Sequence, residues 1–200
     1  MRALKDELRR EMRIRRLDVS MEQSRKCAEM AARHIARIPG FREAGVVAVY
    51  APVRGELDTA PLVSELRSRG KTVCYPCMAP SHRLLAFHAV DDETRLVPSR
   101  LGIPEPTEDM PVVPSDRIEW IIVPGLAFDA RGGRLGWGRA YYDTTLAAKP
   151  LALRVGLAHG FQIVHSVPET ADDERMDAIV TELGARLTLA RTQLNMRRKR

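Results

Sequence analysis

Glycine, arginine and aspartate follow one short apolar segment in a pattern suited to phosphate chemistry. Residues 120–123 read Trp-Ile-Ile-Val and are stopped by a proline-glycine pair, which predicts a buried strand. Arg134 then begins a segment at 134–140 with two glycines, which we call the glycine loop, and Asp143 follows. Glycines let backbone N–H groups approach a phosphate, and arginine adds fixed positive charge. Asp143 is the hard oxygen ligand that a phosphate-bound Mg²⁺ needs, so this segment predicts a phosphate site.

The N-terminal segment predicts a helix with one apolar stripe and one basic face. Leu4, Leu8 and Met12 recur every four residues, and Lys5 and Arg9 line a neighbouring face. A basic face of this kind either is solvated or binds phosphate. Spacing alone favours the solvated face.

The rest of the chain alternates predicted helices and strands. Strands are expected at 46–50, 71–75, 84–88, 119–123, 153–157 and 178–181, and helices from Ser20 to a stop at 39–40, from Thr59 to Gly70, and over 141–148. Ser20 begins a Ser-x-x-Gln capping box, and Thr59 is expected to cap its helix. The alternation predicts an α/β fold, a single three-layer domain over 1–196 with a mostly parallel central sheet and helices on both faces.

The predicted topology also places the site. In open parallel sheets, ligands bind beyond the carboxyl ends of the strands. The loops that follow Tyr50 and Val123 both leave strands at that edge. We therefore expect the loop 51–58 and the glycine loop to face one another. A polar segment is expected after 181.

Composition restricts the class of protein. Apolar residues make up 44% of the 200, no apolar run approaches bilayer length, and the N-terminus is charged throughout, so we expect no membrane association and a cytoplasmic protein. Three cysteines fit a reducing compartment. The net charge is +6, but the basic tail at 197–200 carries four of those charges, which argues against nucleic acid as a partner. Cys74 and Cys77 suggest a redox pair or zinc ligands, yet their place at a strand end favours ordinary packing.

Several short motifs are spread over nearly the whole chain. These are Lys5-x-x-Leu8-Arg9, Tyr50 with Gly55-Glu56-Leu57-Asp58-Thr59, Gly102-Ile103-Pro104-Glu105-Pro106, Val123 to Asp129, Arg134-Leu135-Gly136 through Tyr141-Tyr142-Asp143, Gly156-Leu157-Ala158, Gln162, Pro168-Glu169, Asp173, Asp177 and Thr181-Glu182. A lone glycine loop would be weak evidence, whereas an ordered set of motifs is specific. Together these motifs resemble the 5-formyltetrahydrofolate cyclo-ligase family.

The resemblance implies an enzyme that converts 5-formyltetrahydrofolate to 5,10-methenyltetrahydrofolate with ATP and Mg²⁺. In this family phosphorylation of the formyl oxygen gives an iminophosphate, N10 attacks, and phosphate departs. The implied partner is the folate substrate alone, bound by a monomer or a weak homodimer. Little covalent chemistry would fall to the protein, which must align the γ-phosphoryl group and stabilise spreading charge.

The resemblance also assigns residues. It implies ATP binding by Lys5, Arg9, Arg134, Leu135, Gly136, Trp137, Gly138, Arg139, Ala140, Tyr141 and Tyr142, with Arg134 and Tyr142 catalytic, substrate binding by Ala51 and Glu56, and Mg²⁺ binding by Asp143 and Asp173. For Lys5 and Arg9 this reverses the interpretation from spacing. Gln162 either faces the site or caps a loop.

One departure from the family pattern is Ala140, where the family usually has glycine. If the position requires a positive φ, alanine costs roughly 1 kcal/mol or more; inside the first turn of a helix it is harmless. The departure and the basic tail motivate an alternative: a diverged, non-catalytic member that binds nucleotide, folate or RNA. A third hypothesis is another small-molecule kinase or ligase on the same scaffold.

Overall fold

The computed structural model describes residues 1–79, 83–148 and 152–188. The predicted basic tail at 197–200 lies outside these residues. Its role therefore stays a prediction.

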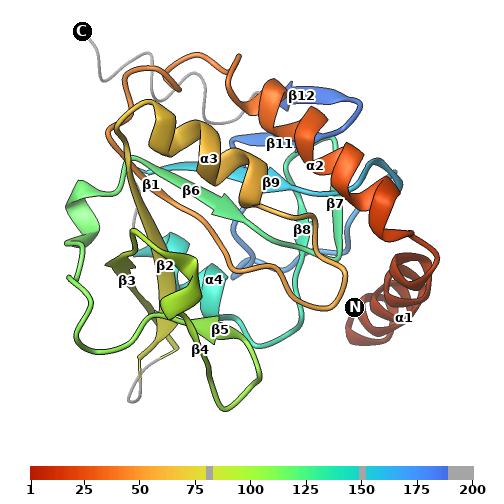
Figure 1. Ribbon diagram of the computed structural model, residues 1–200. Helices are drawn as coiled ribbons and strands as arrows, with labels where there is room; N and C mark the ends of the chain where they lie inside the picture. The colour runs from red at the N-terminus through yellow and green to blue at the C-terminus, as the bar shows by residue number, and fades with distance from the viewer. Residues whose placement is uncertain (80–82, 149–151, 189–200) are drawn as a thin grey trace, which may run out of the picture.

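A seven-stranded sheet forms the centre of the molecule, with the strand order β12-β11-β9-β6-β1-β2-β3 (Figure 1). The strands are β1 Val46–Ala48, β2 Thr72–Met78, β3 Leu85–Ala89, β6 Trp120–Val123, β9 Leu153–Leu157, β11 Ala178–Thr181 and β12 Gly184–Leu187. Every pairing from β11 to β2 is parallel, whereas the edge strands β12 and β3 pair antiparallel. The predicted mostly parallel α/β sheet is confirmed.

Helices cover both faces of this sheet. Helices α2 (Met21–Ile35) and α3 (Ala60–Ser68) pack on one face, and the short α4 (Tyr141–Ala147) packs on the other (Figure 1). Successive residues of β6 point to opposite faces, so Ile122 joins the first core and Ile121 joins the second. A strand buried on both sides explains why 120–123 is apolar without alternation.

The first helix, α1 (Arg2–Leu17), covers a second, small sheet rather than the central one. That sheet consists of β7 (Ala127–Asp129), β8 (Arg134–Leu135) and β10 (Ile163–Val164). Buried Met12 of α1 packs with Leu135 and Val167 in a separate apolar cluster. The small sheet begins four residues after β6 ends, so α1 and the glycine loop lie at the carboxyl edge of the parallel strands.

Shorter elements complete the described part of the chain. They are β4 (Val97–Pro98), β5 (Pro104–Glu105) and three single turns of 3-10 helix, η1 (Glu93–Arg95), η2 (Ser115–Arg117) and η3 (Gly160–Gln162). β4 and β5 pair with each other beyond β2 and β3.

Several local predictions need correction. The capping box at Ser20 is present, but α2 ends at Ile35 instead of continuing to 39–40. Thr59 occupies the N-cap position of α3 without capping it, because its hydroxyl donates to the carbonyl of Tyr50 (3.0 Å), and Asp58 accepts the Ala60 N–H instead. The polar segment expected after 181 contains β12, which pairs with β11.

A buried carboxylate shapes the turn that leads into the glycine loop. Asp129 accepts the backbone N–H groups of Arg131 (2.9 Å), Gly133 (3.0 Å) and Val167 (2.8 Å). Although burial opposes it, these hydrogen bonds hold the pKa of Asp129 below its usual value. A Cβ at Gly132, where φ is +89°, would lie 2.4 Å from the Met176 carbonyl oxygen, so only glycine fits this turn.

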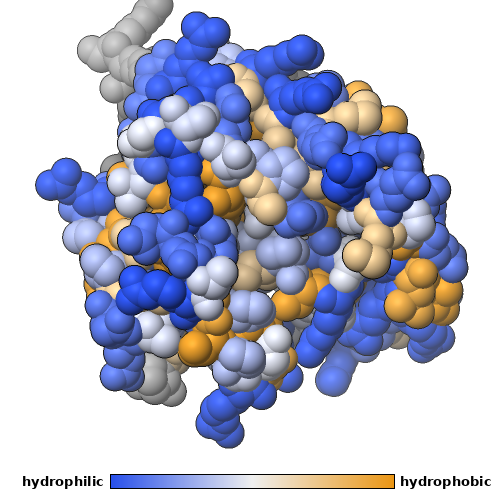
Figure 2. All heavy atoms as spheres, viewed as in Figure 1, coloured by the Kyte–Doolittle hydropathy of each residue, from blue (hydrophilic) through white to orange (hydrophobic). Residues whose placement is uncertain are grey.

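Hydrophilic residues dominate the surface seen in Figure 2, and hydrophobic residues form small separate groups on it. Exposed apolar side chains occur where α1 meets α2, at Ile14, Leu17 and Met21. In the described part of the chain, no helix combines the length and the apolar character that a membrane crossing requires.

Candidate active site

A cavity of about 370 Å³ lies where α1, the loop 51–58, the glycine loop and the segment 170–173 meet. Every residue that the sequence and the resemblance assigned to a site lines this cavity, from Lys5 at the N-terminus to Asp173. The two loops predicted to face one another do so. The cavity therefore gathers residues that are far apart in the chain.

The cavity is lined by basic residues of α1 and β8, together with Arg54 and Arg139 from the loops. Arg134 is 7% exposed; its guanidinium donates to Asp143 Oδ1 (2.7 Å) and to the Pro124 carbonyl (3.4 Å). Arg9 donates through Nε to the carbonyl of Gly136 (3.0 Å), which ties α1 to the glycine loop. Lys5 forms an ion pair with Asp173 (2.5 Å). These contacts place three cations along the glycine loop.

The two carboxylates predicted to bind Mg²⁺ are both half-buried and both paired with a cation. Asp143 accepts from Arg134, and it also accepts the backbone N–H of Glu174 (3.3 Å), so it lies next to the 173–174 peptide. Burial opposes a low pKa at Asp173, but hydrogen bonds from Lys5 and Thr170 hold its pKa below the usual value. Carboxylate oxygens at one wall of a cavity suit a hard divalent cation.

Glu56 occupies the opposite side of the cavity and is 7% exposed. Its Oε1 accepts the indole N–H of Trp137 (3.0 Å), and its Oε2 accepts the backbone N–H of Val53 (3.2 Å). Burial raises the pKa of Glu56, while the Trp137 hydrogen bond and the Arg16 guanidinium oppose that rise. The neighbouring Ala51 is buried in the wall.

Two tyrosines begin α4 and pack on the second core. Tyr141 and Tyr142 are both half-buried, and the ring of Tyr142 lies with its centroid 5.7 Å from the Arg134 guanidinium carbon. Burial, followed by the nearby Glu56 carboxylate, raises the pKa of Tyr142, so this phenol is neutral at physiological pH. A neutral hydroxyl in the cavity is a hydrogen-bond donor.

An apolar wall of the cavity was missed by sequence reasoning. It consists of Pro76, Met78, Leu85, Leu101 and Ile103, from β2, β3 and the segment before β5. Glu105 closes the wall and accepts the Met78 N–H (3.2 Å) and the Cys77 thiol (3.6 Å). The motif at 102–106 was a signal that this segment matters, but it carried no indication of which side faces a ligand.

The sequence left open the roles of Gln162 and of the cysteines at 74 and 77, and the structure decides them. Gln162 is fully buried and donates to the carbonyls of Gly125 (2.8 Å) and Leu126 (2.9 Å), so it caps a loop. Burial and the adjacent Glu105 raise the pKa of Cys77 to about 11, so its thiol stays protonated. Cys74 is buried, and its thiol donates to the Val47 carbonyl, in agreement with ordinary packing.

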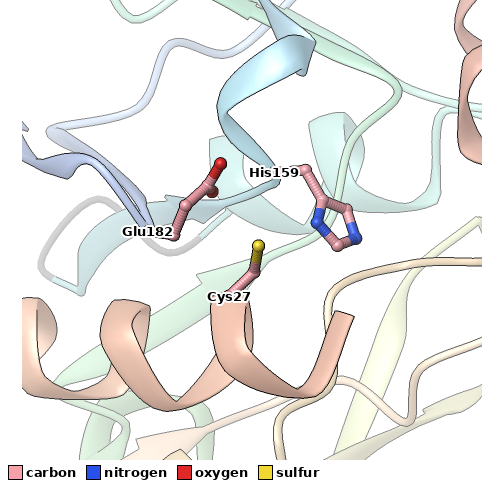
Figure 3. A group of neighbouring side chains, drawn as sticks. All are labelled: Cys27, His159 and Glu182. Atoms are coloured by element: carbon pink, nitrogen blue, oxygen red, sulfur yellow. The ribbon is translucent and has the colours of Figure 1, made fainter. Parts of the chain in front are cut away.

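Cys27, His159 and Glu182 form a second group of potential metal ligands, with donor atoms within 4.8 Å of one another (Figure 3). The structure shows what these groups already do. Glu182 accepts the Gly160 N–H with both oxygens (3.0 and 2.8 Å), and the side-chain oxygen of Gln162 accepts the backbone N–H of His159 (2.9 Å). Burial, then Glu182, raises the pKa of Cys27, and burial lowers that of His159. The group therefore fixes the loop after β9.

Ala140 has a left-handed backbone conformation, with φ of 60° and ψ of 6°, at the N-cap of α4. Of the two alternatives left by the sequence, the position therefore requires a positive φ. A Cβ in this region costs roughly 1 kcal/mol or more relative to glycine. The chain retains this strain at the point where the glycine loop enters α4.

We expect Ala140→Gly to raise the free energy of unfolding by about 0.5–1 kcal/mol, because it removes the strained Cβ. Thermal unfolding measures the change, and a rise of about 2–4 °C in Tm corresponds to 1 kcal/mol at this chain length. The matched control is Ala147→Gly at the end of the same helix, which should lower stability by up to about 1 kcal/mol. Equal destabilisation by both variants would contradict the strain at position 140.

The fold and the cavity together define the class of protein. It is an α/β protein with a ligand cavity at the carboxyl edge of a parallel sheet, and the cavity is lined by a glycine loop, fixed cations and paired carboxylates. The model of the 5-formyltetrahydrofolate cyclo-ligase family matches residues 1–182. The chain belongs to the 5-formyltetrahydrofolate cyclo-ligase family.

Individual relatives agree with this membership. The chain is 36% identical over 178 residues to the 5-formyltetrahydrofolate cyclo-ligase of Escherichia coli K12, covering 85% of this chain and 96% of the relative. It is 30% identical over 169 residues to the Haemophilus influenzae cyclo-ligase, covering 82% and 90%. The solved structure of Aquifex aeolicus 5,10-methenyltetrahydrofolate synthetase superposes with a TM-score of 0.80 at 33% identity, covering 93% of each chain.

Proposed function

We propose that the protein converts 5-formyltetrahydrofolate to 5,10-methenyltetrahydrofolate at the expense of ATP. One observation carries this proposal. All the residues that the family resemblance assigns to ATP, Mg²⁺ and folate, from positions 5 to 173, converge on one cavity and line it.

The reaction must overcome a poor leaving group, because a formamide oxygen does not depart when N10 attacks the formyl carbon. Transfer of the γ-phosphoryl group of ATP to that oxygen forms an O–P bond, and ADP departs. N10 then attacks the activated carbon and loses its proton, and inorganic phosphate leaves with the oxygen. The protein's task is positioning and charge stabilisation.

Each wall of the cavity suits one part of this task. Lys5, Arg9 and Arg134 bind the phosphates, and the backbone of the glycine loop approaches them where side chains are absent. Asp143 and Asp173 fit Mg²⁺, which would neutralise phosphate charge when bound. When phosphate oxygens pair with Arg134 and Lys5, they replace Asp143 and Asp173 as the partners of these cations. The two carboxylates then become available as Mg²⁺ ligands. This exchange predicts that nucleotide and Mg²⁺ bind together.

The folate occupies the other half of the cavity. Glu56 accepts paired N–H donors of the pterin, the backbone at Ala51 borders the same ring, and the apolar wall from Pro76 to Ile103 receives aromatic surface. Tyr142 lies between the halves, beside Arg134, and donates its neutral hydroxyl to the reacting oxygen. Arg134 stabilises the charge that develops during phosphoryl transfer.

The test is a coupled assay on the purified protein with 5-formyltetrahydrofolate, ATP and Mg²⁺. We expect the absorbance of the methenyl product to appear with one ADP released per turnover, and neither to appear when any component is omitted. Folded protein that yields no product, or that hydrolyses ATP independently of the folate, would contradict the proposal.

A further inference from the structure

One hydrogen bond joins the two halves of the cavity. The indole N–H of Trp137, in the glycine loop, donates to Glu56, which lies 81 residues earlier in the loop after β1. The backbone of Trp137 therefore belongs to the wall assigned to phosphate, whereas its side chain donates a hydrogen bond to Glu56, the carboxylate assigned to the pterin. A residue placed in this way can transmit the position of one loop to the other.

The indole ring is held from several sides. Guanidinium carbons of Arg13, Arg16 and Arg54 lie 5.1, 5.7 and 5.2 Å from its centroid, within the range of cation–π attraction. Arg13 and Arg16 belong to α1, and α1 also holds the glycine loop through the hydrogen bond from Arg9 to Gly136. The ring position thus depends on where the glycine loop sits against α1.

We propose that Trp137 is a positioning residue that orients Glu56 for the folate and links folate binding to the nucleotide. This inference rests on the proposed function. It goes beyond it by giving the side chain of Trp137 a role in folate recognition, although Trp137 lies in the segment that contacts the nucleotide.

The charge of Glu56 depends on this contact. Ionisable groups face the carboxylate from α1 (Arg16), from its own loop region (Tyr50 and Arg54) and from α4 (Tyr142). Both tyrosines are neutral because burial raises their pKa values. Burial raises the pKa of Glu56, and of the contacts that oppose this rise, the hydrogen bond from Trp137 has the largest effect. Loss of that bond would therefore protonate Glu56 at a higher pH and weaken its acceptance of pterin N–H groups.

The link to nucleotide follows from the glycine loop. Gly138 has a positive φ of 88°, and residues 138–140 are exposed, so few side-chain contacts fix this end of the glycine loop in the free protein. Phosphates bound to its backbone would restrict it and with it the indole of Trp137. Folate then binds Glu56 when its partner Trp137 is already ordered. Each ligand therefore increases the affinity of the protein for the other.

The experiment measures ligand affinities by calorimetry on the full-length protein and on Trp137→Phe, from about pH 6 to about pH 8.5. The ligands are 5-formyltetrahydrofolate and a non-hydrolysable ATP analogue with Mg²⁺, each alone and together. We expect Trp137→Phe to weaken folate binding about tenfold and the ATP analogue by less than about twofold. As pH falls, folate affinity should be lost at a higher pH than in the wild type.

Cooperativity gives a second readout. In the wild type the ATP analogue should tighten folate binding by about fivefold or more, and in Trp137→Phe this factor should fall to about one. In a Glu56→Gln background, Trp137→Phe should have no further effect on folate affinity. Trp120→Phe is the matched control: Trp120 is 4% exposed, packs on Phe41 and does not line the cavity, so both affinities should be unchanged.

Four outcomes would overturn the role of Trp137: normal folate binding by Trp137→Phe, equal weakening of both ligands, additive losses in the double variant, or an unchanged pH dependence together with unchanged cooperativity. Thermal unfolding of each variant separates these outcomes from loss of fold. Wild-type protein that binds no folate contradicts the proposed function itself, whereas normal folate binding by Trp137→Phe contradicts only the inference.

Discussion

Replacing Arg134 by alanine is expected to lower kcat/KM for ATP by about 10³-fold, with folate affinity nearly unchanged. The Arg134 side chain is 4% exposed, and its guanidinium lies between Asp143 and Tyr142. Its Nε has no hydrogen-bond partner among the described residues, so it retains a free donor. Fixed positive charge at a buried position stabilises phosphoryl transfer without reorganisation during the reaction. Steady-state kinetics and folate calorimetry measure the two effects.

The conservative control is Arg134→Lys, which keeps the charge but loses the planar guanidinium. We expect it to recover only a small part of the lost rate, because an ammonium cannot hold Asp143 and a phosphate with the same geometry. If alanine and lysine behave alike and both also lose folate binding, Arg134 is a structural residue. Near-wild-type kcat/KM in Arg134→Ala would contradict its catalytic role.

The parts of the fold that follow from hydrophobic pattern were predictable from the sequence. The apolar runs that became β6 and β9 stand out because a strand buried on both faces has few polar residues. The small sheet was not predicted, since β8 and β10 have two residues each and such lengths carry no periodicity. Thr59 shows a related limit: its residue type fits a cap, but the nearby Tyr50 carbonyl competed for its hydroxyl.

The site, like the fold, was predictable only in part. Parallel topology alone placed the loop 51–58 and the glycine loop at one edge, and the cavity is there. The resemblance supplied the roles of Lys5 and Arg9, for which spacing favoured a solvated face. Neither source gave the contact between Trp137 and Glu56, because it depends on the docking of two loops distant in sequence.

The backbone conformation of Ala140 could not be predicted from the local sequence. The sequence specified the two possible backbone conformations and the energetic consequence of each, but the choice depends on how the glycine loop enters α4. The structure selects the positive φ. Strain retained at one position of a ligand loop is expected more often at functional sites than elsewhere.

Asp143→Asn is expected to lower kcat/KM for ATP by about 10²–10³-fold while changing folate affinity by less than about twofold. Asparagine has nearly the same size and keeps an oxygen that can accept from Arg134, so the local packing should persist. It removes the negative charge that Mg²⁺ requires, and the affinity for a hard divalent cation depends strongly on that charge. Calorimetry with Mg²⁺ and a non-hydrolysable ATP analogue measures the loss directly.

The dependence on metal concentration identifies the cause of this loss. If Asp143 binds Mg²⁺, raising the Mg²⁺ concentration should restore part of the activity of Asp143→Asn, because mass action offsets weaker binding. Asp109→Asn is a suitable control, since Asp109 is exposed, pairs with Arg95 (2.9 Å) and lies outside the cavity. Equal loss of folate and nucleotide binding in Asp143→Asn would instead mean that the carboxylate mainly holds Arg134 and the 173–174 peptide in place. The site would then need another metal ligand, and Asp173 would be the first residue to test.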